Sequence, residues 1–173
     1  MADTNEAAKE GLLDVGDLCR AISYDPETGI FVRLVSAGTS KAGSRAGTVG
    51  PKGYRRIMVD GQRFEESHLA WLFVNGYWPR ELIDHKNGNP SDNRICNLRE
   101  ADYSENAANK KRHVNGRSGL KGASLHKATG LWQAQIMKNG KKKYLGLFDT
   151  PESAHAAYVT AAGEMFSSFA RAA

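Results

Sequence analysis

The chain has 173 residues, enough for one medium domain or two small ones, and 40% of them are hydrophobic, which allows modest cores. It has neither the run of about 18 apolar residues that a membrane-spanning helix needs nor a basic-then-apolar leader, so we expect a soluble, unexported protein. Its two distant cysteines, Cys19 and Cys96, exclude a disulfide framework and a cysteine-rich zinc site, as in a reducing cytoplasm.

The net charge of +5 is unevenly spread along the chain. Residues 1–27 carry seven acidic side chains and two basic ones, so the remainder is strongly basic. A basic body is typical of proteins that bind phosphate backbones, because each neutralised phosphate releases condensed counterions. The charge by itself fits a role in solubility equally well.

The first 65 residues predict a short helix and two hairpins after a polar start. The helix is expected over residues 12–20, the first hairpin pairs 21–24 with 30–34, and the second pairs 54–59 with 62–65. Asp60-Gly61 is a strong turn signal for the second hairpin. The Gly-, Ser- and Ala-rich residues between the hairpins, 36–50, predict a mobile loop.

Basic residues and a compact helix complete this N-terminal part. Arg55, Arg56 and Arg63 are expected to give the second hairpin a basic edge. Residues 67–75 predict an apolar helix that Gly76 ends, as C-terminal glycines commonly do.

The stretch at residues 83–106 is too polar to be core. Its centre, 87–93, predicts a loop, because Gly88 supplies a positive φ, Pro90 lacks a donor, and the Asn and Asp side chains satisfy turn backbones. Short β-like segments flank the loop at 81–84 and 95–99. A helix is then expected up to residue 113, because Asp102 precedes Glu105 by three residues, which is the spacing of a capping box.

Strand, loop, strand and helix together could aim Asp84 and His85 at Asn106. Carboxylate and amide oxygens are hard ligands that suit Mg²⁺ or Mn²⁺, and a neutral imidazole can take a proton from water. Asn97 could orient that imidazole from the second strand. A calcium loop of the EF-hand kind is excluded, because its sixth position, counted from Asn87, is Asp92 where glycine is needed.

The order DH, NGNPSDNR, NLR and EN resembles the ββα-metal motif of HNH endonucleases, in the branch of phage and intron-encoded homing nucleases. The resemblance implies that His85 is the general base, Asp84 a metal ligand, and Asn97 the residue that braces the base and the loop. It places Asn106 where the last histidine of the motif falls, as a second ligand to one Mg²⁺ or Mn²⁺ ion rather than zinc. The expected products are a 5′-phosphate and a 3′-hydroxyl.

The same resemblance extends over about residues 20–113, on "GY" at 53–54, HLAW and NGYWP. Lys110 falls where some members have a further ligand, but an ammonium cannot bind a metal. Arg94, Arg99 and Lys110 are instead expected to contact phosphates near the ion.

The C-terminal part predicts three strands and a helix after a linker at 114–120. Asn139-Gly140 turns a hairpin of 131–138 and 141–148, which pairs 138 with 141, 136 with 143 and 134 with 145. The expected inner face carries Trp132, Ala134, Ile136, Leu145 and Leu147, and the outer face carries Gln133, Gln135, Met137, Lys142 and Tyr144. A helix that Thr150 caps should cover the inner face with Ala154, Ala157, Tyr158, Ala161 and Met165.

Residues 119–171 resemble the ethylene-response-factor (apetala-type) DNA-binding domain, on LKGAS, GLWQAQI, NGKKKYLGLFDT and AHAAYVTAA. The resemblance implies that the outer face of the sheet contacts DNA. The positions that match the family's DNA contacts are Lys121, Ser124, His126, Gln135, Met137, Lys142 and Tyr144. Several arginines of the plant domains are absent, so their recognition sequence does not transfer.

We therefore expect an α+β protein, with a ββα-metal nuclease domain after β-hairpins and a C-terminal three-stranded antiparallel sheet packed on one helix. The expected parts are an acidic segment at 1–20, a nuclease domain at 21–113, a linker at 114–120 and a DNA-binding domain at 121–173. The predicted function is a metal-dependent, site-specific endonuclease of double-stranded DNA, phage-encoded and acting in the bacterial cytoplasm, with no membrane or evident protein partner. A non-catalytic DNA-binding regulator and an RNA-directed nuclease are the alternatives, the latter disfavoured because the outer face has few stacking aromatics.

Overall fold

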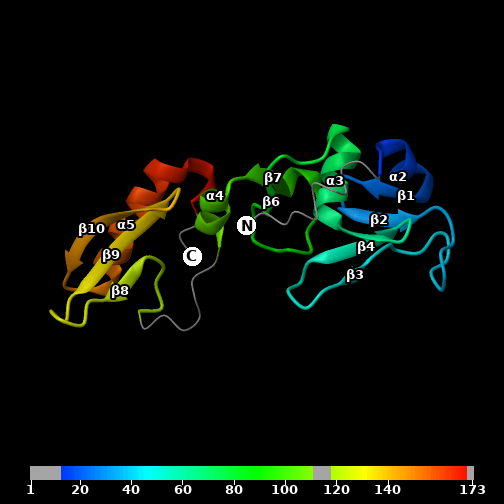
Figure 1. Ribbon diagram of the computed structural model, residues 1–173. Helices are drawn as coiled ribbons and strands as arrows, with labels where there is room; N and C mark the ends of the chain where they lie inside the picture. The colour runs from blue at the N-terminus through cyan, green and yellow to red at the C-terminus, as the bar shows by residue number, and fades with distance from the viewer. Residues whose placement is uncertain (1–12, 111–117, 171–173) are drawn as a thin grey trace. The chain divides into compact units, whose positions relative to one another are not determined.

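The computed structural model describes residues 13–110 and 118–170, in two compact units that divide between Glu100 and Ala101 (Figure 1). The polar start at 1–10, His113 and most of the expected linker lie outside the described residues. The fold is α+β, with small antiparallel sheets in the first unit and a three-stranded sheet packed on a helix in the second. No helix of the described part is long and apolar enough to cross a bilayer.

The first unit begins with the predicted helix and hairpin. Helix α2 (Val15–Ala21) starts where the Asp14 carboxylate accepts a hydrogen bond from the Asp17 amide at 2.7 Å. Strands β1 (Ile22–Asp25) and β2 (Ile30–Arg33) follow as an antiparallel pair, with Tyr24 opposite Phe31. Both predictions are confirmed.

The second hairpin is also confirmed and gains a third strand. Strands β4 (Arg55–Val59) and β5 (Gln62–Glu65) meet at Asp60-Gly61, whose positive φ angles of 46° and 77° match the predicted tight turn. The preceding stretch contributes β3 (Thr48–Val49), which pairs with β4, and it buries Ala46 completely. The segment expected to be a loop throughout is therefore partly built into the sheet.

Helix α3 (Glu66–Asn75) follows β5 without a break and ends at Gly76, which is left-handed at φ 78°. Its Leu69, Ala70 and Leu72 join the core of this unit. The other buried members of that core are Leu13, Leu18, Ile22, Tyr24, Phe31, Ala46, Ile57, Val59, Phe64, Ile83 and Leu98. The core therefore connects both hairpins to the strand that leads into the polar loop.

A strand precedes the polar loop, as predicted, but a 3₁₀ turn rather than a strand follows it directly. Strand β6 (Leu82–His85) leads in and pairs with β7 (Leu98–Ala101). The expected strand at 95–99 is wrong over its first three residues, where a 3₁₀ turn, η1 (Ile95–Asn97), forms instead. The Asn97 amide donates to the Arg94 carbonyl at 2.9 Å, which turns the chain back toward the loop before β7 begins.

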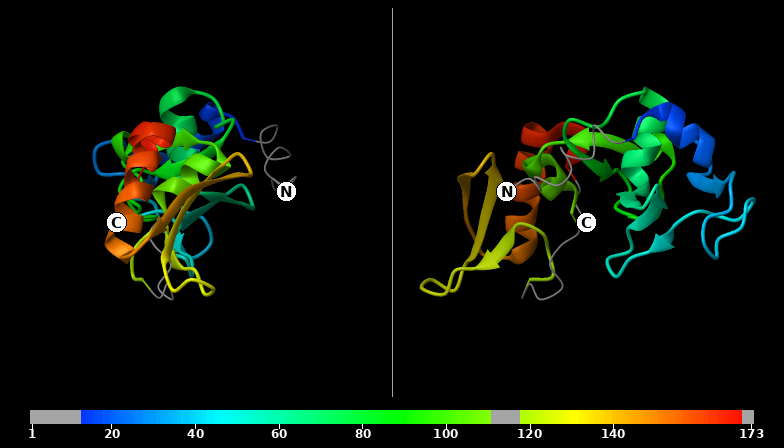
Figure 2. Two further views of the ribbon diagram at one scale, coloured as in Figure 1. Left: turned by 90° about the vertical axis from the view of Figure 1, so that its left-hand side faces the viewer. Right: turned by 45° about the vertical axis from the view of Figure 1, so that its right-hand side comes forward.

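The second unit begins with helix α4 (Tyr103–Asn109), which has the predicted capping box between Asp102 and Glu105. The helix ends at Asn109, short of the predicted extent. Strands β8 (Ala123–Leu125), β9 (Trp132–Lys138) and β10 (Lys141–Phe148) form a sheet in the order β10-β9-β8. Helix α5 (Pro151–Phe166) covers one face of this sheet, and a 3₁₀ turn, η2 (Ser167–Phe169), follows it (Figure 2).

The predicted register of the C-terminal hairpin holds near the turn and then shifts. Lys141 pairs with Lys138 and Lys143 with Ile136, but a bulge between Tyr144 and Gly146 places Gly146 opposite Ala134. Gly146 has φ 134°, which side chains other than hydrogen rarely allow. The prediction that 134 pairs with 145 is therefore wrong by one residue.

The bulge also changes which side chains share the inner face. Leu145 still packs against the core, but Leu147 now pairs with Gln133, and Phe148 pairs with Trp132. Because directly opposed residues point to the same side, Phe148 replaces Leu147 on the face of Trp132. The buried residues of α5 are Ala154, Tyr158, Ala161, Ala162 and Phe166, and the expected Met165 is partly buried and packs against the same core. Ala162 and Phe166 join the stripe, whereas the expected Ala157 stays partly exposed.

Candidate active site

The acidic residue and the histidine singled out by the sequence lie next to each other at the end of β6, and both are buried. Asp84 is 4% exposed and His85 is 5% exposed. β6 pairs with β7, and just past its end the Lys86 amide donates to the Asn97 carbonyl at 2.9 Å. The strand pair therefore sets the backbone from which both side chains project.

Asp84 forms an ion pair with Arg99 of β7. The Nε and one Nη of Arg99 both lie 2.8 Å from the same carboxylate oxygen, Oδ2. A carboxylate this buried needs a positive partner, because removing it from water costs several kcal/mol. Arg99, predicted to contact phosphate, thus has a defined contact to the predicted metal ligand.

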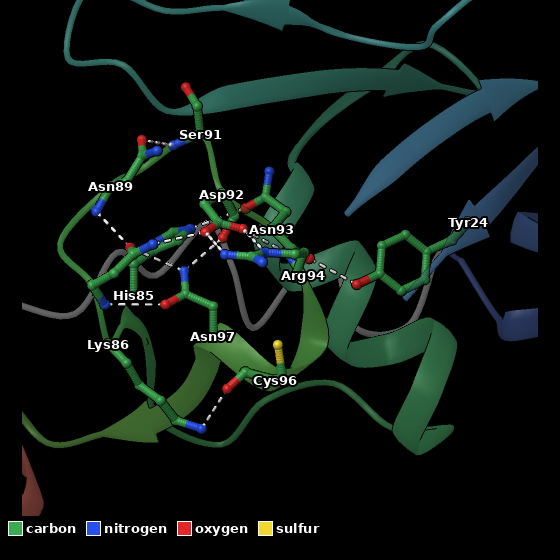
Figure 3. A network of polar contacts seen from close by, with 11 residues as sticks. Tyr24, His85, Lys86, Asn89, Ser91, Asp92, Asn93, Arg94, Cys96 and Asn97 are labelled. Carbon is green, nitrogen blue, oxygen red and sulfur yellow. Dashed lines mark hydrogen bonds and ion pairs between the residues drawn. The ribbon is translucent and has the colours of Figure 1, made fainter. Parts of the chain in front are cut away.

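Asn97 holds the loop together from the 3₁₀ turn. Its amide oxygen accepts from the Asn87 amide at 3.0 Å, and its nitrogen donates to the Asn87 side chain at 3.1 Å and to the Asp92 carbonyl at 2.8 Å (Figure 3). These three contacts fix both ends of the turn at 87–92. They support the bracing of the loop that the resemblance implied, whereas the orienting of His85 by Asn97 stays a prediction.

The imidazole contacts a different asparagine, which the sequence did not single out. His85 Nε2 lies 3.0 Å from Oδ1 of Asn93, which is 1% exposed. The Asn93 amide nitrogen donates to Glu66 Oε2 at 3.0 Å, and Arg55 Nε donates to Glu66 Oε1 at 3.0 Å. His85, Asn93, Glu66 and Arg55 therefore form one buried chain of polar contacts.

Glu66 is the fully buried member of this chain. Its exposure is 0%, and burial raises the pKa of its carboxyl while the neighbouring Arg55 lowers it. The Arg55 side chain is only 11% exposed and also donates to the carbonyls of Ala46 and Gly47. The expected basic edge is therefore wrong for Arg55, which points into the unit, and Arg56 pairs with Glu65 at 2.7 Å.

The first hairpin fixes the backbone of Asn93. The Tyr24 hydroxyl donates to the Asn93 carbonyl at 2.7 Å, and burial raises the pKa of that hydroxyl above its ordinary value, which keeps it a donor. Gly29, at φ 71°, packs so closely that a Cβ there would lie 2.4 Å from the Arg94 nitrogen. The Ile95 amide also donates to the Pro26 carbonyl at 3.2 Å. These contacts position the loop from residues more than 60 positions earlier in the chain.

Arg94 lies on the outer side of the same loop. Its Nε and one Nη donate to the two oxygens of Asp92 at 2.8 and 2.6 Å, and this contact lowers the pKa of Asp92 to about 2. Almost half of the Arg94 side chain is exposed. Its phosphate contact stays a prediction. The Asp92 carboxylate already orients the guanidinium.

The remaining predicted residues of the nuclease site, Asn106 and Lys110, belong to the second unit. Asn106 is half-buried on α4, and Lys110 is exposed at the C-cap of that helix. Their roles as metal ligand and phosphate contact stay predictions. Residues 13–110 and 118–170 contain no group of three or more His, Cys, Asp or Glu side chains placed to hold a metal. An ion held mainly by water and phosphate needs fewer protein ligands, and the Asp84 carboxylate is a hard donor of the kind that Mg²⁺ prefers.

The predicted DNA-contacting residues of the second unit separate into two groups. Ser124, Met137, Lys142 and Tyr144 are exposed on the sheet, and Gln135 is partly exposed. The register places Lys142 beside Met137 and Tyr144 beside Gln135, so these four share the predicted outer face.

Lys121 and His126 also make contacts within the unit, and their DNA contacts stay predictions. The Lys121 ammonium donates to the carbonyls of Ala108 and Lys110, the latter at 2.7 Å, which satisfies the end of α4. His126 Nδ1 lies 2.9 Å from the Thr129 hydroxyl. Lys121 thus joins α4 to the sheet, a contact that the sequence pattern did not indicate.

Comparisons with known proteins support the nuclease assignment of one segment. The chain is 38% identical over 74 residues to "Protein 3.8" of Escherichia phage T7, an alignment that covers 42% of this chain and 61% of the phage protein. No solved structure matches. Residues 67–108, from α3 to α4, match the family model described as HNH endonuclease, and this segment contains Asp84, His85, Asn93 and Asn97.

Proposed function

We propose that the protein is a metal-dependent endonuclease that cuts double-stranded DNA. The observation that carries this proposal is the buried Asp84-His85 pair at the end of β6, within the segment that matches the HNH endonuclease family. A buried acid beside a buried imidazole, each held by a defined polar partner, is preorganised for hydrolysis. Polar groups that serve only solubility lie exposed on the surface.

In this proposal, Asp84 would hold one Mg²⁺ or Mn²⁺ ion, with Asn106 as the predicted second ligand. The bound ion would supply positive charge to the scissile phosphate and to the leaving oxygen. His85 takes a proton from the attacking water, and the water oxygen forms the new bond to phosphorus. The bond from phosphorus to the 3′ oxygen breaks, and that oxygen takes a proton from solvent, which gives a 5′-phosphate and a 3′-hydroxyl.

Arg99 has a specific task in the same proposal. It holds Oδ2 of Asp84 by two nitrogens, so it fixes the orientation of the carboxylate and compensates its charge. Arg94 and Lys110, both exposed, are the cations proposed to contact the phosphates that flank the cut.

The outer face of the C-terminal sheet is proposed to direct the enzyme to its site. Gln135, Met137, Lys142 and Tyr144 project from one face while α5 covers the other. Amide and ammonium groups on such a sheet can donate to base edges and phosphates in a major groove. The proposal therefore joins a homing-type nuclease to an apetala-type reader of double-stranded DNA.

Cutting of a supercoiled plasmid tests the proposed function. We expect nicked or linear product with Mg²⁺ or Mn²⁺, none with EDTA, and products that ligase can rejoin, because ligase requires a 5′-phosphate and a 3′-hydroxyl. A pure protein that binds the plasmid but leaves it intact with either metal would contradict the nuclease proposal. That outcome would support a DNA-binding regulator that uses the same exposed sheet.

A further inference from the structure

The buried chain from His85 to Arg55 contains two residues, Asn93 and Glu66, that have no part in binding the ion or in moving the proton. Both are almost completely buried, at 1% and 0% exposure. Burying a carboxylate and an amide is costly unless their donors and acceptors are satisfied. Their partners are each other, together with His85 on one side and Arg55 on the other.

The direction of each hydrogen bond in this chain follows from the chemistry of the groups. Arg55 can only donate, and the Glu66 carboxylate can only accept. The Asn93 amide nitrogen therefore faces Glu66, and its carbonyl oxygen faces the imidazole. An amide oxygen only accepts, so His85 Nε2 must carry the hydrogen. In a neutral imidazole, Nδ1 is then the nitrogen without a proton.

We propose that Glu66 and Asn93 are positioning residues that hold His85 in the tautomer protonated on Nε2, so that Nδ1 is the atom that takes the proton from water. The catalytic part of this inference rests on the proposed nuclease function. Arg55 acts one step further away, because it keeps the Glu66 carboxylate in place and compensates its charge.

The surroundings of Asn93 support this role. Its carbonyl is held by the Tyr24 hydroxyl at 2.7 Å, and Gly29 leaves room for nothing larger than hydrogen beside the backbone at 93–94. A side-chain amide on such a fixed backbone cannot rotate without losing the bond to Glu66. The histidine is therefore held by a rigid acceptor rather than by a mobile loop.

The arrangement also suits the charge that develops in the reaction. When Nδ1 takes a proton, the imidazole becomes positive, and its Nε2 hydrogen bond to Asn93 becomes charge-assisted. Glu66 lies on the other side of that amide and contributes a negative charge to the chain.

The tautomer of His85 can be measured in the full chain without DNA or metal. Long-range proton–nitrogen NMR of ¹⁵N-histidine protein distinguishes a protonated ring nitrogen of a neutral imidazole from a bare one. His85→Gln identifies the signal. We expect Nε2 to be protonated in the wild type, and a proton on Nδ1 would overturn the proposal whatever the variants do.

Asn93→Leu removes the acceptor at nearly constant volume, and Asn89→Ala is the control in the same loop. With Asn93→Leu we expect a mixture of tautomers, a single-turnover cutting rate lower by about 10- to 100-fold, and unchanged DNA affinity. Asn89→Ala should change neither the tautomer nor the rate. An unchanged tautomer in Asn93→Leu would overturn the proposal.

Glu66→Gln keeps the volume and an amide oxygen that can accept from Asn93, while its amide nitrogen then faces Arg55. We expect the tautomer to be kept and the cutting rate to stay closer to wild type than in Asn93→Leu. A larger rate loss than in Asn93→Leu, with the tautomer kept, would contradict the positioning role. A wild type that has Nε2 protonated but never cuts DNA would refute the proposed function, while an active enzyme with Nδ1 protonated would refute only this inference.

Discussion

The loop at 86–97 and the outer face of the C-terminal sheet are both polar, but their side chains are held in opposite ways. His85, at the start of the loop, and Asn93 and Asn97 within it are buried, and each side chain has a defined hydrogen-bond partner. On the sheet, Met137, Lys142 and Tyr144 are exposed along one face. A site that makes and breaks bonds requires fixed groups, whereas a surface that adapts to a duplex benefits from side chains that can move.

Helix α4 belongs to the second unit. It lies at the end of the segment that matches the HNH family, yet Ala108 packs with Ile136 and Phe166 of the second unit. The Ser104 hydroxyl also accepts from the Asn139 amide at the tip of the hairpin. A helix of seven residues is marginal by itself, so the sheet and α5 stabilise the helix that carries Asn106.

The largest expected effect is the loss of the Asp84 carboxylate. Asp84→Asn should lower the Mg²⁺-dependent cutting rate on the order of 10³-fold, because charge stabilisation by a bound ion is worth several kcal/mol. The measurement is the single-turnover rate over a range of Mg²⁺ concentrations.

A control is needed because Asp84→Asn leaves the Arg99 charge with less compensation. The double variant Asp84→Asn with Arg99→Gln removes both charges and should cut as poorly as the single variant while unfolding less readily. Wild-type rates in either variant would show that Asp84 is not a ligand.

Lys121→Met tests whether the second unit supports α4. Each hydrogen bond from a charged donor contributes about 1.5–3 kcal/mol, so the loss of those to Ala108 and Lys110 should speed amide exchange in α4 by at least about 10-fold. DNA affinity should change little. Unchanged exchange would mean that the ammonium does not secure the helix.

Lys142→Met makes the same substitution as Lys121→Met, but on the outer face of the sheet. It should affect DNA binding and leave helix α4 unchanged. We expect amide exchange in α4 to stay as in the wild type and DNA binding to weaken severalfold. The slope of log affinity against log salt concentration should fall by about 1, because one phosphate contact is lost. The same salt slope as in the wild type would exclude this face as the one that contacts DNA backbone.

The smallest effect concerns the ion pair between Asp92 and Arg94 on the rim of the loop. The pKa of Asp92 is lowered from 3.8 to about 2, so the pair stabilises the fold above pH 3.8 and this contribution is lost as the pH falls toward 2. Asp92→Asn should therefore cost at most about 1 kcal/mol at neutral pH and progressively less as the pH falls through about 2. Urea unfolding of both proteins across that range checks the prediction, which a pH-independent difference would contradict.

Local patterns predicted most of the fold because local chemistry determines those elements. Asp60-Gly61 and Asn139-Gly140 adopt positive φ angles that form tight turns, and the Asp102-Glu105 capping box starts its helix. The adjacency of Asp84 and His85 likewise needed no tertiary information. The bulge at Gly146 was missed because an extra residue leaves no mark in an alternating pattern.

The partners of the site were harder to predict because packing brings them together. Nothing in the sequence distinguishes Asn93 from the other asparagines of its loop, and Glu66 precedes it by 27 residues. A charged residue at the junction of a strand and an apolar helix was the available signal for Glu66. Its burial depends on Arg55, which points inward from β4 and compensates the charge of the carboxylate.

The central claim is that His85 is the base of a hydrolytic site. The most direct test is the single-turnover cutting rate of His85→Ala in Mg²⁺, with DNA affinity and folding measured on the same samples. We expect a rate about 10²- to 10⁴-fold below wild type with unchanged affinity. A folded His85→Ala protein that cuts DNA as fast as the wild type would contradict it.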